Sequence, residues 1–191
     1  MGVNPFMTER ETNWTYQVMK KIEKPAAGEF APETIVYIGL LPDDGRVLDH
    51  LANNLKATSE FILSLPEEKL LYRYAEGKWT MKEIMVHISD DERIYAYRAL
   101  RFARGDATDL PGFDQDAYAI QSNANERDIK DILDEFATVR QATISLFEAF
   151  DSKALMRAGM ADGRIMSVRA AAYHIAGHEM RHINIIRERY L

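Results

Sequence analysis

The chain is organised around the stretch Tyr173-His174-Ile175-Ala176-Gly177-His178-Glu179-Met180-Arg181-His182-Ile183, where three of its five histidines recur every four residues. Residues four apart on an α-helix lie on the same face, with Cβ atoms about 5–6 Å apart. Two neighbouring histidines can therefore point imidazole nitrogens at one metal ion. His174 and His182 are separated by about 12 Å of helical rise, so all three cannot easily share one ion. The spacing predicts a two-histidine clamp whose third ligand comes from elsewhere in the chain.

Histidines at this spacing also occur as hydrogen-bonded core residues or as exposed residues. A structural interpretation therefore stays open beside the metal-binding one. Glu179 directly follows His178, but it points about 100° away from it around the helix axis. Its position alone does not make it a catalytic base.

The composition is that of a globular protein without cysteine chemistry. The chain has 191 residues, of which 47% are hydrophobic and 28% charged, and this length can bury one substantial core. The absence of cysteine excludes disulfides, thiolate metal ligands and a cysteine nucleophile. It also fits a reducing cytoplasmic location.

The charge and the hydropathy pattern exclude several classes of partner. A formal net charge of −6 argues against non-specific nucleic-acid binding, which requires positive charge. The N-terminus lacks a basic segment followed by an apolar one, and no window approaches the roughly 18 apolar residues that span a bilayer. We therefore expect a cytoplasmic protein with no nucleic-acid and no membrane partner.

Four segments show the spacing of three and four between apolar residues that predicts amphipathic helices. They cover residues 43–65, 80–104, 125–150 and 167–191. Strand signal is weak, and only residues 33–41 and Arg164-Ile165-Met166 are predicted to be extended. We therefore expect an all-α fold, an antiparallel four-helix bundle, formed by residues 43–191.

Two regions outside these helices are expected to cover the bundle. Residues 1–42 are predicted to form an irregular arm that packs on it, with a short helix over residues 8–21 and an extended segment over residues 33–41. Residues 105–124 are predicted to be a long loop that covers one end of a pocket, since loops of this length are often functional.

The second long helix supplies the missing ligand. Thr80 and Glu83 form the sequence pattern of a capping box, and His87 follows within the apolar stripe. Bundles build metal sites from inward-facing side chains of facing helices. His87 and two histidines of the C-terminal stripe would give three nitrogen ligands and open positions for water or substrate. His50 has no second candidate ligand nearby and is interpreted as structural or exposed.

Several segments together carry a family resemblance. They are Lys78-Trp79-Thr80-Met81-Lys82-Glu83-Ile84, His87-Ile88-Ser89-Asp90-Asp91-Glu92-Arg93, Tyr97-Arg98-Ala99-Leu100-Arg101-Phe102-Ala103-Arg104-Gly105, Leu110-Pro111-Gly112-Phe113-Asp114 and His174-Ile175-Ala176-Gly177-His178-Glu179-Met180-Arg181-His182. In these segments the chain resembles the DinB superfamily of DinB/YfiT-like metalloenzymes, over roughly residues 30–191.

The resemblance implies a four-helix bundle of unusual topology with a divalent metal on three histidines. Carried over residue by residue, the ligands are His87, His178 and His182, and His174 lines the pocket or supports a ligand. The metal would be Zn or Ni, with Fe, Mn or Co as alternatives. Members of the family also imply a homodimer. Residues 1–25 lie outside the resemblance.

The resemblance implies more than one activity. Known members include S-transferases that use low-molecular-weight thiols such as bacillithiol or mycothiol, a thiol-dependent isomerase, and proteins described as metal-dependent hydrolases. We therefore expect a metal-dependent transferase or hydrolase, in which Asp90, Glu92 or Arg98 orients the reacting groups. Asp90 and Asp91 also fit a role in supporting a ligating histidine, because such histidines usually donate their other N–H to a carboxylate.

Other interpretations stay open from the residues alone. The acidic residues after His87 fit equally a solvated face or a pair with Arg93. Arg98, Arg101 and Arg104 could contact an anionic thiol substrate, but such a row more often forms surface salt bridges. The whole protein also fits a metal-binding stress-response protein without turnover, or a helical dimerisation module in which the histidines are incidental.

Overall fold

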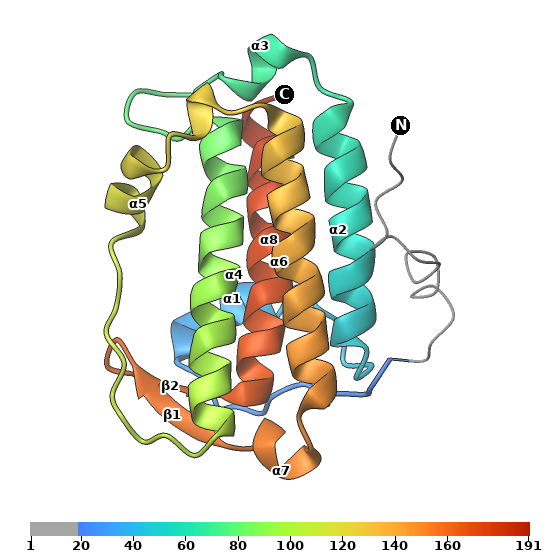
Figure 1. Cartoon of the computed structure of the whole chain (residues 1–191), viewed down its shortest axis with the longest axis vertical. Coiled ribbons are helices and arrows are strands. Elements are labelled where there is room, and N and C mark those ends of the chain that lie inside the picture. Colours follow the sequence, from blue (N-terminus) through green and yellow to red (C-terminus); the bar gives the residue numbers. More distant parts are fainter. Residues whose placement is uncertain (1–18) are drawn as a thin grey trace, which may run out of the picture.

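The computed structural model describes residues 19–191, and its body is a bundle of four long helices. They are α2 (Val47–Leu63), α4 (Met81–Ala103), α6 (Ile129–Ala149) and α8 (Val168–Arg189). Helix α4 packs on α8 and α6, and α2 packs on the same two helices, so α2 and α4 stand at opposite corners (Figure 1). The predicted all-α four-helix bundle is confirmed.

Three of the four long helices, α4, α6 and α8, begin at a residue whose side chain caps them. Thr80 accepts a hydrogen bond from the Glu83 backbone N–H, and the Glu83 carboxylate accepts one from the Thr80 N–H, so the predicted capping box is confirmed. Asp128 and Ser167 cap α6 and α8 in the same manner through their side-chain oxygens. Such caps satisfy N–H groups that the helix itself leaves without partners.

A long crossover sets the topology. Figure 1 shows α4 and α6 running in the same direction, joined by residues 104–128, which climb back along the bundle. Helices α2 and α8 run the opposite way, so that the α4–α8 and α2–α6 contacts are antiparallel. This arrangement places α4 directly against α8, the two helices that carry the histidines.

The crossover contains more structure than the predicted loop. Residues Gln115–Gln121 form helix α5, whose N-terminus is capped by Asp114. The one-turn helices α3 (Glu67–Leu70) and α7 (Ser152–Leu155) and the 3₁₀ turn Ala124–Glu126 complete the connections. The prediction that residues 105–124 form an irregular loop was wrong in part, because the seven residues between Asp114 and Ser122 are helical.

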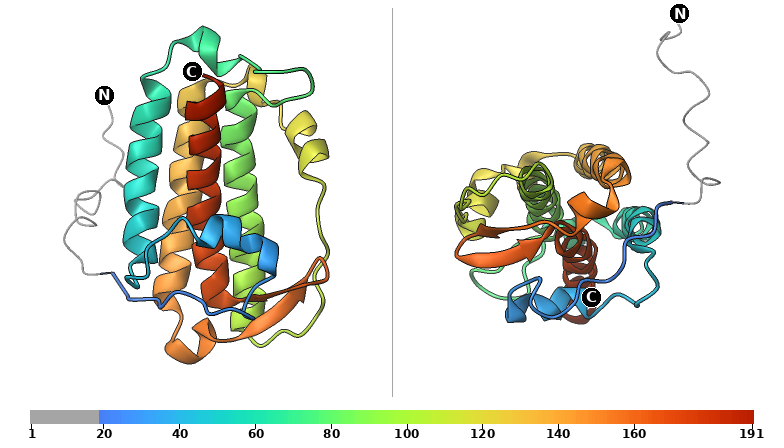
Figure 2. Two further views of the ribbon diagram at one scale, coloured as in Figure 1. Left: turned by 180° about the vertical axis from the view of Figure 1, so that it is seen from behind. Right: turned by 90° about the horizontal axis from the view of Figure 1, so that it is seen from below.

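The described part of the arm, residues 19–42, contacts the bundle through its short helix, and the segment predicted to be extended is helical. Pro32–Thr34 form a 3₁₀ turn and Ile35–Ile38 form the short helix α1, which lies across α8 (Figure 2). The close approach depends on Gly177, because a Cβ there would stand 2.2 Å from the Tyr37 carbonyl oxygen. The helix predicted over residues 8–21 falls almost entirely outside the described residues.

A small hairpin closes the lower end of the bundle. Strands β1 (Ala158–Ala161) and β2 (Arg164–Ser167) pair antiparallel through a turn at Asp162-Gly163, where both residues have positive φ. This is the backbone that two-residue hairpin turns require. The extended conformation predicted for residues 164–166 is confirmed, and the hairpin brings Asp162 and Arg164 beside α1.

Apolar side chains fill most of the space between the helices, and a buried ionic cluster lies among them. Arg140 is fully buried and its Nη2 lies 2.8 Å from Glu92 Oε2 and 2.9 Å from Glu179 Oε2. Among residues 19–191, no helix has both the length and the apolar character needed to cross a membrane.

Candidate metal centre

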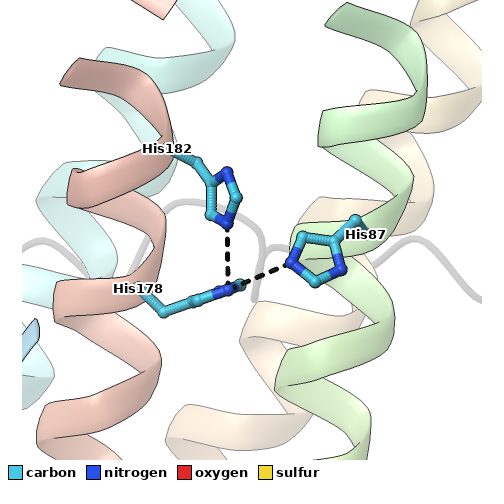
Figure 3. Close-up of side chains that lie close together, drawn as sticks. All are labelled: His87, His178 and His182. Atoms are coloured by element: carbon cyan, nitrogen blue, oxygen red, sulfur yellow. Dashed lines mark hydrogen bonds between the residues drawn. The ribbon is translucent and has the colours of Figure 1, made fainter. Parts of the chain in front are cut away.

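Three histidines from two facing helices meet inside the bundle. His178 Nε2 lies 3.1 Å from His87 Nε2 and 3.1 Å from His182 Nε2. Figure 3 shows the three rings pointing toward one another from the two helices. One ring nitrogen from each histidine lies within 4.8 Å of the other two. His87 comes from α4, whereas His178 and His182 lie on successive turns of α8. The structure therefore brings together the three residues that the family resemblance implied.

Burial keeps these imidazoles neutral. It lowers the pKa of His87 and lowers that of His178 well below its ordinary value. Burial likewise lowers the pKa of His182 to about 3. Only the neutral ring has a nitrogen lone pair available to a metal at neutral pH.

Asp91 links two histidines of the C-terminal stripe. Its Oδ2 lies 3.4 Å from His178 Nδ1 and 3.2 Å from His174 Nε2. Burial alone would raise the pKa of Asp91, but the contacts with His178 and His174 hold it well below its usual range. Nδ1 of His178 lies on the Asp91 side of the ring, so Nε2 is the nitrogen that faces His87 and His182. This is the carboxylate–histidine arrangement that orients metal ligands in proteins.

Aromatic rings hold the histidines in place. The Trp79 ring lies 4.6 Å from that of His87, and Tyr37 meets His178 edge-on at 5.4 Å. Tyr95 stacks on His174 at 3.6 Å between ring centroids. Rings packed from three sides limit how far the imidazoles can turn.

The donor set fits a divalent metal. Metal–nitrogen bonds of about 2.0–2.1 Å allow two ligating nitrogens to lie up to about 4 Å apart, and the 3.1 Å separations satisfy this limit. Three neutral nitrogens without a thiolate suit Zn, Ni, Co or Fe, and three protein ligands leave positions for water or substrate.

Two cavities reach the histidine cluster from different sides. The larger, of about 610 Å³, is lined by His178, His174 and Asp91 at its inner end. The smaller, of about 320 Å³, is lined by His182 and Trp79. Gln115 at the start of α5 borders both cavities, so the crossover covers the centre as the sequence analysis expected.

The candidate catalytic residues are placed far apart. Asp90 lies 3.3 Å from Arg93 and does not line either cavity. Glu92 is buried against Arg140 in the core. Arg98 alone lines the larger cavity, where its Nη2 donates to the Pro111 carbonyl oxygen.

Glu179 is turned away from the site although its surroundings match a known pattern. His178-Glu179-Met180-Arg181-His182 has the spacing His-Glu-x-x-His, in which the glutamate acts as general base in metalloproteases. Here the Glu179 carboxylate is buried, accepts a hydrogen bond from Thr58 and pairs with Arg140. It lines neither cavity and is not placed to serve as a base.

The remaining histidines have structural partners. His50 pairs with Asp44 at 2.9 Å, away from the centre, as the sequence analysis expected. His174 lines the larger cavity, and its Nδ1 has no hydrogen-bond partner among the described residues. It supports Asp91 and is not one of the three clustered rings.

Sequence reasoning missed the residues that the arm, the hairpin and the aromatic side chains contribute. Tyr37, Tyr95 and Arg164 all line the larger cavity. Tyr95 lies eight residues after His87 and four after Asp91, so the helical spacing on α4 could have identified it. Tyr37 has no such signal, because its place depends on the packing of α1.

Comparisons with known proteins agree with this architecture. A sequence model of the DinB superfamily matches residues 50–186, more than two thirds of the chain. A protein of Oceanobacillus iheyensis named "putative metal-dependent hydrolase" is 36% identical over 67 residues, 35% of this chain and 38% of that relative.

A solved structure shares the fold. It is YfiT from Bacillus subtilis, described as a probable metal-dependent hydrolase with an unusual four-helix bundle topology. The similarity has a TM-score of 0.64 and covers 87% of this chain and 91% of that one. At 17% identity it shows the fold alone.

Proposed function

The chain belongs to the DinB superfamily, and from this membership and its three-histidine cluster we propose that it is a divalent-metal-dependent hydrolase. The observation that carries the proposal is the meeting of His87, His178 and His182, of which His178 lines the larger cavity and His182 the smaller one. The names of the Oceanobacillus and Bacillus relatives point to the same class of reaction.

Each residue of the centre has a defined part in this proposal. His87, His178 and His182 would hold the metal, which when bound lowers the pKa of water and polarises a carbonyl group. Asp91 fixes the tautomer and orientation of His178 through Nδ1. The rings of Trp79 and Tyr37 shield the cluster from bulk water, which strengthens electrostatic interactions at the centre.

The direct test combines metal loading with turnover. The protein is stripped of metal, reloaded separately with Zn, Ni, Co, Fe or Mn, and assayed on a panel of activated esters and amides. We expect metal-dependent hydrolysis that is lost in His178→Ala and retained in His50→Ala. Metal binding without turnover on any substrate would favour a non-catalytic metal-binding protein, and failure to bind metal would refute the proposal.

A thiol S-transferase is a second candidate, favoured by the presence of two cavities. The larger one has charged walls, whereas Trp79, Ile84 and Ile185 contribute apolar surface to the smaller one. A thiol and an electrophile would therefore each have a place beside the histidines. Conjugation of low-molecular-weight thiols to a chloro-dinitro-arene by the metal-loaded protein tests this activity.

A further inference from the structure

Arg98 is a buried cation in the wall of the larger cavity. Its residue is 6% exposed, and its guanidinium lies 5.0 Å from the centroid of the Tyr95 ring. Its Nη2 donates to the Pro111 carbonyl oxygen at 3.0 Å. Among residues 19–191, no carboxylate lies within salt-bridge distance of it, and the Pro111 contact leaves most of its five N–H donors unused.

Two arginines close to Arg98 differ from it in this respect. Arg164, at the rim of the same cavity, pairs with both Glu33 and Asp162. Arg101, one turn further along α4, pairs with Asp106. A buried charge without a partner is costly, so a cation kept in this position is best explained by an anion that the cavity receives.

The spacing between Arg98 and Asp91, which contacts His178, sets an approximate length for the ligand. His87, Asp91, Tyr95 and Arg98 follow one another along a single face of α4 at spacings of four, four and three. Seven residues separate Asp91 from Arg98, which corresponds to about 10 Å of helical rise. Asp91, Tyr95 and Arg98 all line the larger cavity, which connects the two ends.

We propose that Arg98 binds a carboxylate at the far end of the substrate whose reacting group lies at the histidine cluster. The proposal rests on the metal-centre function above and names the substrate class: an elongated molecule with an anionic terminus. The planar guanidinium can hold a carboxylate through two parallel hydrogen bonds.

The charged residues around the cavity favour a ligand with one negative charge over a ligand with two. Three carboxylates besides Asp91 share the wall, those of Glu33, Asp114 and Asp162. Their field opposes a dianionic phosphate more strongly than a carboxylate, because repulsion grows with the charge of the ligand. The subsite is therefore assigned to a carboxylate.

The test uses straight-chain hydroxamic acids on the zinc-loaded protein. The hydroxamate binds the metal, and the opposite end of the chain carries a carboxylate, a primary amide or a phosphonate. Dissociation constants are measured by calorimetry over a series of chain lengths. We expect the carboxylate to bind roughly tenfold or more tightly than the amide, in line with a charge-assisted hydrogen bond. The preference should be greatest for chains that span about 10 Å and smaller for the phosphonate.

Variants of α4 assign the preference to one side chain. Arg98→Met should abolish the difference between carboxylate and amide, and Arg98→Lys should retain part of it. Arg101→Met, the same change in a partly exposed arginine of the same helix, should leave it intact. Equal binding of carboxylate and amide by the wild-type protein would overturn the proposal, even if both Arg98 variants failed to fold.

The two proposals fail in different ways. If the hydroxamates bind equally with and without zinc, the metal-centre function is refuted. If they bind only with zinc but without regard to the terminal group, the metal centre stands and the role of Arg98 is refuted. A carboxylate preference that survives in Arg98→Met would likewise refute that role.

Discussion

The carbonyl oxygen of Tyr37 lies 2.2 Å from the point that a Cβ at Gly177 would occupy. Helices α1 and α8 therefore touch through their backbones, one position before His178. This contact sets the Tyr37 ring 4.9 Å from the His174 ring and 5.4 Å from the His178 ring. The arm, which lies outside the segment matched by the family model, thereby forms a wall of the cavity.

Replacement of Gly177 by alanine should destabilise the protein by about 1–3 kcal/mol, because the new methyl group overlaps the backbone of α1. Helix propensity alone predicts the opposite sign, a gain of roughly 1 kcal/mol. Urea denaturation measures the change, and limited proteolysis of residues 30–42 reports whether α1 has separated. A more stable Gly177→Ala protein with an intact arm would contradict the close contact.

The long helices could be predicted because their signals are local, whereas α1 could not. Ile35, Val36, Tyr37 and Ile38 have the β-branched and aromatic composition typical of strands. They are helical because the backbone opposite them has no side chain at Gly177. That contact joins residues about 140 positions apart, which no local pattern reveals.

The site was predictable where helical spacing determined it. His178 and His182 lie one turn apart, and the apolar stripe of α4 points His87 toward them. The neighbours of His87 were harder to assign, because Asp90 and Asp91 are adjacent in sequence and only Asp91 faces α8. The spacing His-Glu-x-x-His would also mislead, since Glu179 serves the core ion pair.

Asp91→Asn should weaken metal binding about 10- to 100-fold, because His178 would lose the carboxylate that orients it. Asp90→Asn is the matched control, because it makes the same change at the preceding residue. It removes the carboxylate that pairs with Arg93. Competition with a chromogenic chelator gives both affinities. Equal effects of the two substitutions would show that the contact with His178 does not support the metal.

The metal-free protein should lose stability as the pH falls from about 7 to 5. The pKa of His182 is lowered from 6.5 to about 3, and the pKa values of His87 and His178 are lowered in the same direction. Between these values the unfolded chain binds more protons than the folded one, so acid favours unfolding. The carboxylate of Glu29, whose pKa the bond with Arg169 lowers to about 2, contributes only below about pH 4.5.

Chemical denaturation at several pH values separates the contribution of the histidines from that of Glu29. His182→Gln should reduce the slope between pH 7 and 5, whereas Glu29→Gln should leave this part of the curve unchanged. A flat stability curve over the same range in the metal-free wild-type protein would show that the histidines titrate normally in the fold.

Arg140→Met should be the most destabilising of these changes, at about 3–5 kcal/mol, because it leaves two buried carboxylates without their cation. Glu92 and Glu179 both contact Arg140 Nη2, and their side chains are 1% exposed. Arg93→Met provides the comparison, since its partners Asp90 and Glu135 are partly exposed and their loss should cost about 0–1 kcal/mol.

A triple variant distinguishes a lost ion pair from a lost side-chain volume. When Glu92→Gln and Glu179→Gln are added to Arg140→Met, the buried charges disappear and much of the stability should return. Urea denaturation of the single and triple variants at pH 7 gives the difference. If the triple variant were no more stable than Arg140→Met, the cost would arise from the packing of Arg140 against Phe136, whose ring lies 4.8 Å from the guanidinium, and the charges would contribute little.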